Sequence, residues 1–194
     1  MFSRTGYIAL EEELSSLLSE KRFLHSKATA LTCVSLAEQY CEPIDPGLCY
    51  QAGLVHDIVR QWDAEALVSY AQKWHLDLEE EEREDPVLLH GPVGAHFLRQ
   101  KGYPEELCLA VRYHTLGSIG MGRLGLVLFI ADFIEPGRTH LSEAVRTGLL
   151  SLPSLDLLCL QILEMQDAYL ASNGKVSARC SKELAHYLLS GKIL

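Results

Sequence analysis

Several absences narrow the classes of protein to which this 194-residue sequence can belong. Its six cysteines form no C-x-x-C pair, which argues against a zinc ribbon or a thioredoxin-like motif. No uninterrupted apolar run approaches the ~20 residues needed to span a bilayer. Basic charge is in deficit, because 17 Lys and Arg face 26 Asp and Glu and the net charge is −9. Since non-specific nucleic-acid binding needs a basic surface, we expect neither nucleic acid nor a membrane as a partner.

Strand patterns and targeting signals are missing as well. No segment shows convincing alternation of apolar and polar residues between turns, so we expect an all-α domain of about eight to ten helices. The N-terminus lacks the basic and apolar regions of a signal peptide. Most cysteines lie within apolar helical patterns and are interpreted as small core residues. Together these features predict a cytoplasmic protein with reduced thiols.

Helical periodicity dominates what is present. It predicts nine helical segments, at 7–18, 21–41, 48–59, 64–74, 86–100, 104–114, 123–134, 153–172 and 178–189. Asp63 is a predicted N-cap, and Pro86 stands where a proline often opens a helix. The acidic stretch 77–85 is interpreted as a solvated loop or helix end, because no loop geometry supports Mg²⁺ or Ca²⁺ binding there.

The most informative stretch is Gly53–Val59, in which His56 and Asp57 follow one another at the end of an apolar run. Burying an ionised carboxylate costs several kcal/mol unless a cation meets it. No Lys or Arg falls inside the run, and a metal ion accepts both imidazole nitrogen and carboxylate oxygen. The alternative is a core histidine and aspartate that hydrogen-bond one another.

Further polar residues repeat this placement within, or at the ends of, apolar helical segments. Asp132, for example, follows five consecutive apolar residues and precedes Phe133 and Ile134. The complete set is His25, His56, Asp57, His90, His114 and Asp132. Six such donors are enough for two divalent or trivalent ions that share one carboxylate. The remaining histidines, His75, His96, His140 and His186, fit ordinary structural roles better.

The order H…HD…H…H…D along an all-α chain resembles the HD-domain metal-dependent phosphohydrolases. The string Arg22–Ser26 resembles their first-histidine motif. The strings 90–95, 112–115 with Gly117, and 131–138 are similar to the YqeK branch of that superfamily. This resemblance covers roughly residues 20 to 140. It implies a compact multi-helix HD-type bundle over 1–194, with its core at 20–140 and the C-terminal helices of 141–194 packed on that core.

Proteins of that branch are symmetrical bis(5′-nucleosyl)-tetraphosphatases, so the resemblance implies a hydrolase that cleaves diadenosine tetraphosphate into two ADP through a metal-activated water. It also implies a dinuclear site, with iron as the expected metal and Mn, Co or Zn as alternatives. By motif position, His25, His56, Asp57 and Asp132 would hold one ion, and Asp57 would bridge to a second ion at His90 and His114. Asp57 and His56 are the expected catalytic residues, and Asp57 would also orient the attacking water. The expected partner is a dinucleoside polyphosphate or ADP, bound by a monomer or homodimer.

Six residues around these positions are candidates for substrate contacts: Arg138, Thr115, Gly117, Ala28, Arg60 and Lys27. Arg138 offers a guanidinium fork for phosphate, although it could instead cap a helix C-terminus. Lys27 and Arg22 flank His25 and are either phosphate contacts or plain surface charge. Arg60 stands where many HD phosphohydrolases carry a lysine, so the charge is kept on a bulkier planar donor.

Three alternatives remain open from the sequence. An HD phosphohydrolase acting on another nucleotide would share the same metal residues. A nucleotide-binding sensor would have the same pocket without useful turnover. A helical interaction protein would bury the histidines as satisfied core residues and bind no metal.

Overall fold

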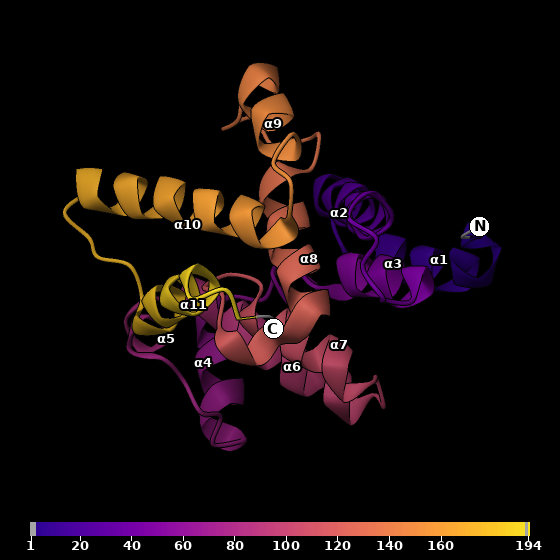
Figure 1. Ribbon diagram of the computed structural model, residues 1–194. Helices are drawn as coiled ribbons and strands as arrows, with labels where there is room; N and C mark the ends of the chain where they lie inside the picture. The colour runs from indigo at the N-terminus through magenta and orange to yellow at the C-terminus, as the bar shows by residue number, and fades with distance from the viewer. Residues whose placement is uncertain (1–2, 193) are drawn as a thin grey trace.

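Every regular element of the computed structural model is a helix within the residues that the structure describes, 3–192 and 194 (Figure 1). The α-helices are α1 (Ile8–Leu17), α2 (Glu20–Gln39), α3 (Pro46–Val55), α4 (Ala64–Lys73), α5 (Glu80–Glu84), α6 (His90–Gln100), α7 (Glu105–Tyr113), α8 (Gly122–Ile134), α9 (Glu143–Leu150), α10 (Leu155–Ser172) and α11 (Arg179–Leu189). Short 3₁₀ helices cover η1 (Arg4–Tyr7), η2 (Pro86–Leu89) and η3 (Ile119–Met121). The predicted all-α class is confirmed. The predicted domain 1–194 includes residues 1, 2 and 193, which lie outside the described residues.

Two helices were not predicted, and one predicted helix is too long. The helices α5 and α9 have five and eight residues, too few turns for an apolar period to stand out. The helix expected over 48–59 ends at Val55, and turns follow up to Gln61. The predicted N-cap of α4 is present, because Asp63 Oδ1 accepts the Ala66 amide at 2.8 Å.

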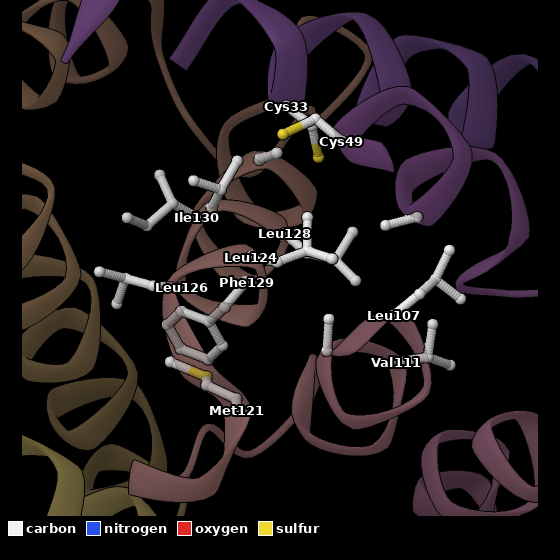
Figure 2. Packing of buried hydrophobic residues seen from close by; sticks show 14 of the residues in the cluster. Cys33, Cys49, Leu107, Val111, Met121, Leu124, Leu126, Leu128, Phe129 and Ile130 are labelled. Atoms are coloured by element: carbon white, nitrogen blue, oxygen red, sulfur yellow. The ribbon is translucent and has the colours of Figure 1, made fainter. Parts of the chain in front are cut away.

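The helix α8 runs through the middle of the molecule and contacts α2, α3, α7 and α10 (Figure 1). Its residues 124–131 are all buried, so the helix is apolar around its whole circumference. Figure 2 shows Leu126 and Ile130 on one side of α8 and Leu124 and Leu128 on the other. A polar side chain on such a helix must have a strong partner, which makes Asp132 near its end notable.

The helices α2 and α3 cross at unusually close range. A Cβ placed on Gly53 of α3 would lie 2.4 Å from the Cα of Ala30 on α2. Glycine is therefore required at position 53 for the two backbones to approach. This crossing sets the distance between His25 on α2 and His56, which directly follows α3.

The acidic stretch is not wholly solvated, which corrects the sequence prediction. Glu82 on α5 is 2% exposed, and its two carboxylate oxygens accept from Arg112 of α7 at 2.5 and 2.8 Å. A two-pronged pair of this kind offsets the cost of burying the carboxylate. The pair ties α5 to the last turn of α7, just before His114.

The cysteines largely follow the prediction of core residues. Cys33, Cys49, Cys108, Cys159 and Cys180 are buried and free, and burial raises the pKa of each thiol. Cys33 and Cys49 lie where α2 meets α3 (Figure 2). Cys41 is exposed. Among the described residues, no helix is both long and apolar enough to cross a bilayer.

The close α2–α3 crossing predicts that alanine is unfavourable at Gly53, in contrast to an uncrowded helical glycine elsewhere. Gly53→Ala should destabilise the fold by about 1–3 kcal/mol, because the new methyl group must push α2 and α3 apart. Gly148→Ala, in α9 with nothing within 4 Å of its added Cβ, should be neutral or stabilise by up to about 1 kcal/mol. Urea unfolding of the two variants measures both effects. Equal stability of the two variants would contradict the assigned close packing.

Candidate metal centre

Six polar side chains from five parts of the chain meet beside α8. His25 comes from α2, and His56 and Asp57 come from the turn after α3. His90 begins α6, and His114 directly follows α7. Asp132 lies near the end of α8. The residues His56, His90 and His114 are at most 5% exposed, and Asp57 is 3% exposed. The structure therefore brings together all six residues that were predicted as metal ligands.

Part of this group surrounds the Nε2 atom of His25. That atom lies 3.2 Å from His56 Nε2 and 3.0 Å from Asp132 Oδ1. Asp57 Oδ2 is 3.7 Å from His25 Nε2 and 3.4 Å from His56 Nε2. We call these four residues, His25, His56, Asp57 and Asp132, set A.

The second part gathers around the other oxygen of the same aspartate. Asp57 Oδ1 lies 3.5 Å from His90 Nε2 and 3.8 Å from His114 Nε2. These two nitrogens are 3.2 Å apart. We call Asp57, His90 and His114 set B. Asp57 thus belongs to both sets and presents one carboxylate oxygen to each.

Three of the histidines are oriented by the same local device. The Nδ1–H of His56, His90 and His114 donates to the carbonyl three residues earlier, at 2.7, 2.5 and 2.7 Å. Each histidine directly follows a helical turn, where carbonyls lack their usual partner within the helix. Because the proton is committed to Nδ1, the Nε2 lone pair faces the cluster. This is the tautomer that metal ligation through Nε2 requires.

His25 lies inside α2, where the nearby carbonyls are already used by the helix. Its Nδ1 instead pairs with Glu135 Oε1 at 3.1 Å. Glu135 is 2% exposed, and its Oε2 accepts the Gly137 amide at 2.5 Å. Sequence reasoning missed Glu135 as a functional residue. The available signal was its position three residues after Asp132, which puts both on one face of the chain as α8 ends.

Charge within the cluster is balanced by its own members. Burial alone would raise the pKa of Asp57, but the charge and hydrogen bond of His56 hold it well below its usual range. Burial also opposes ionisation of Asp132, and hydrogen bonds from His25 and His56 lower its pKa. Burial lowers the pKa of His90, and it lowers that of His114 to about 3. Set B therefore offers neutral imidazoles at neutral pH, which is the form that binds metal.

Two arginines and a threonine surround the cluster. The Arg138 guanidinium contacts Asp132 Oδ1, and its Nε donates to the Asp132 carbonyl at 2.7 Å. Arg22 Nη1 donates to Asp57 Oδ2 at 2.5 Å. The Thr115 hydroxyl is 3.4 Å from His90 Nε2 and 3.3 Å from His114 Nε2. Arg138 and Thr115 are thus next to the ligand atoms.

The other predicted substrate contacts have different surroundings. Lys27 Nζ pairs with Glu11 Oε2 at 2.8 Å and lines a hollow against α1 that includes none of the six clustered residues. Gly117 is buried, with φ +73°, and a Cβ there would lie 2.9 Å from Leu184, so its glycine serves packing. Ala28 is half-buried one turn after His25. Arg60 is also half-buried and lowers the pKa of His90 through its charge.

The donor sets suit transition-metal ions. Ligand atoms of His25, His56 and Asp132 lie within 4.8 Å of one another, as do those of His56, Asp57 and His114. Imidazole and carboxylate together match iron, manganese, cobalt and zinc. Carboxylate and carbonyl acceptors fix the outer nitrogen of every imidazole, which is the usual support around bound metal. The residues present therefore fit a metal site.

Comparisons with known proteins agree with this geometry. A family model described as HD domain matches residues 22–147. The symmetrical bis(5′-nucleosyl)-tetraphosphatase of Staphylococcus aureus (strain NCTC 8325 / PS 47) is 36% identical over 126 residues, covering 63% of this chain and 62% of that protein. Its namesake from Bacillus subtilis (strain 168) is 32% identical, covering 62% of this chain and 64% of that protein. The chain thus spans less than two thirds of the length of these two relatives.

Longer matches exist as well. A protein of the same name from Halalkalibacterium halodurans is 32% identical over 133 residues, covering 67% of this chain and 70% of that protein. Among solved structures, one is titled as a predicted HD superfamily hydrolase involved in NAD metabolism from Clostridium acetobutylicum. It superposes with a TM-score of 0.84 at 29% identity, covering 99% of this chain and 100% of that one.

The contact between His25 and Glu135 yields a prediction. Glu135→Ala should lower metal affinity by about 10- to 100-fold, as loss of such supporting partners does at other metal sites. Competition between the protein and a chelator measures this affinity. Glu105→Ala, which removes an exposed carboxylate paired with Arg99, is the control and should bind metal as the parent does. Unchanged affinity in the Glu135 variant would contradict its role in orienting His25.

Proposed function

Because this chain belongs to the HD domain family, we propose that it is a metal-dependent hydrolase that cleaves diadenosine tetraphosphate symmetrically into two ADP. The observation that carries this proposal is the division of Asp57 between two sets of imidazoles. One carboxylate that faces two donor sets suits two neighbouring ions. Three relatives named symmetrical bis(5′-nucleosyl)-tetraphosphatase support the choice of substrate.

In this proposal set A holds one ion and set B the other. Iron is our first choice because of the resemblance to the YqeK branch, although the donors also suit manganese, cobalt and zinc. When bound, a pair of such ions provides a nucleophile by lowering the pKa of water and neutralises charge on the reacting phosphate. Asp57 is assigned as the catalytic residue, because it would bind both ions and orient the attacking water. His56 supports it from the same turn.

The arginines are assigned to the phosphates. Arg22 and Arg138 each contact an aspartate oxygen of set A. When those oxygens bind a cation instead, the two guanidinium groups are free to pair with phosphate oxygens, for which their fork geometry is well suited. The Thr115 hydroxyl, next to set B, can donate to the same chain of phosphates. Cleavage releases a nucleoside diphosphate, which is stable as an anion, so no dedicated general acid is required.

The positive groups near the site also offset the repulsion between an acidic protein and an anionic substrate. The protein carries a net charge of −9, and a tetraphosphate is strongly anionic. Long-range repulsion must therefore be overcome by local positive charge. Arg22, Arg60 and Arg138, together with two bound cations, would provide it at the reaction centre. Lys27 and Gly117 have no part in this assignment.

The proposal extends to the domain and its location. The helix α10 packs on α8, and α11 packs on α10, which supports one HD-type domain over 1–194 with residues 141–194 on the core of 20–140. Five buried free cysteines support a reducing compartment, and we propose the cytoplasm.

The products of the reaction test the proposed substrate. Protein purified without chelator and supplied with iron, manganese or cobalt should convert diadenosine tetraphosphate into two equivalents of ADP, and EDTA should stop the reaction. Chromatography of the nucleotides measures this outcome. ATP with AMP would contradict symmetrical cleavage. Tight binding without turnover would favour a sensor, and turnover of other nucleotides only would favour a different HD phosphohydrolase.

Metal content separates the roles of the two aspartates. Asp57→Ala should lose both ions, because it belongs to both sets, whereas Asp132→Ala should lose the ion of set A alone. Both should be inactive and should melt at lower temperature than the metal-loaded parent, since ligand binding stabilises the fold by mass action. Elemental analysis and thermal melts measure these effects. Asp167→Ala, on α10 and away from the cluster, is the control. An active Asp132→Ala protein with unchanged melting would overturn the assignment.

A further inference from the structure

Arg146 of α9 is a buried arginine for which the proposed reaction has no use. It is 9% exposed. Its Nε donates to the Ile134 carbonyl at 2.8 Å, and its Nη2 donates to the carbonyls of Arg138 at 3.1 Å and Glu135 at 3.4 Å. Its Nη1 pairs with Glu143 at 2.6 Å. The guanidinium thus directs most of its hydrogen bonds to one short stretch of backbone, 134–138.

That stretch is where α8 ends. The last carbonyls of a helix have no partner within it and carry the negative end of the helix dipole. A buried guanidinium that donates to these carbonyls satisfies them and offsets the negative end of the dipole. It also fixes the path of the chain that leaves the helix. Arg146 therefore holds the turn 134–138 in one conformation through three of its carbonyls.

The same turn carries two side chains that reach set A. Glu135 orients the His25 imidazole through its Nδ1. Arg138 contacts Asp132 through both its Nε and its Nη2. Among the described residues, no hydrogen bond or ion pair joins this turn to the imidazoles of set B. Displacement of the turn would therefore disturb His25 and Asp132 and leave His90 and His114 in place.

We propose that Arg146 is a positioning residue for set A. It shapes the 134–138 turn so that Glu135 holds the His25 imidazole in its ligating orientation and Arg138 Nε stays bonded to the Asp132 backbone carbonyl. This inference rests on the proposed metal-dependent function. It also predicts that substitution of Arg146 lowers the affinity of set A for its ion and leaves that of set B unchanged.

Arg123 offers a matched control. It too is a largely buried arginine that joins separate helices, through Glu42 after α2 and Asp156 of α10. None of these partners contacts set A or set B. Loss of either arginine should weaken the fold, but only loss of Arg146 should act on a metal set.

The experiment titrates metal-free protein with Co²⁺ and follows its visible absorption, with Arg146→Gln, Arg146→Lys and Arg123→Gln beside the parent. Melting in EDTA measures fold stability separately. For Arg146→Gln we expect one of the two binding steps to weaken by about 10- to 100-fold, as for loss of other supporting partners, while the other step is unchanged. Arg146→Lys should recover part of this loss, because its ammonium group can still donate to some of the carbonyls. Arg123→Gln should keep both steps.

A double variant tests the route through Glu135. If Arg146 acts by placing that carboxylate, Arg146→Gln should add little to the loss of affinity in Glu135→Ala. Two losses that add in full would overturn the proposal, as would equal Co²⁺ binding in Arg146→Gln and Arg123→Gln. Should Arg146→Gln fail to fold, Arg146→Lys decides, and parental affinity in both steps would overturn the proposal. Absence of Co²⁺ binding by the parent would instead overturn the proposed function itself.

Discussion

The buried carboxylate of Asp57, shared between two groups of imidazoles, is the constraint on which the rest of the structure depends. Its oxygens face different partners, with His25 and His56 around one and His90 and His114 around the other. A carboxylate this deeply buried is costly unless cationic groups surround it. The close crossing of α2 with α3, the contact of α6 with α7 and the central position of α8 bring those groups to one place.

The histidines show that the backbone at the end of a helical turn can orient an imidazole without help from another side chain. Three of them follow directly on a helical turn, and a carbonyl that the helix leaves free accepts a hydrogen bond from each Nδ1–H. His25 lies inside a helix and has no such carbonyl, so it depends on Glu135 from a distant part of the chain. Set A therefore needs support that set B obtains locally, and the turn after α8 supplies it.

The surrounding charges suit a strongly anionic ligand. Arg22 and Arg138 neutralise the same aspartates that would bind a cation, which leaves their guanidinium groups available to phosphate once a cation takes their place. In a protein with a net charge of −9, such local positive charge would allow the proposed polyphosphate substrate to approach.

The sequence by itself determined the all-α class and singled out six polar residues, because apolar periodicity and a polar residue that interrupts it are both local signals. It did not predict the burial of Glu82, the support from Glu135 or the role inferred for Arg146. His25 and Glu135 are separated by 110 positions, and Glu82 and Arg112 by 30, so no local period reports these pairs. For the same reason the sequence did not show that Lys27 pairs with Glu11, or that a Cβ at Gly117 would lie 2.9 Å from Leu184. Only the packing of α2, α5, α7, α8 and α9 decided which charged side chains meet, because such partners are selected by distance in space and not by spacing along the chain.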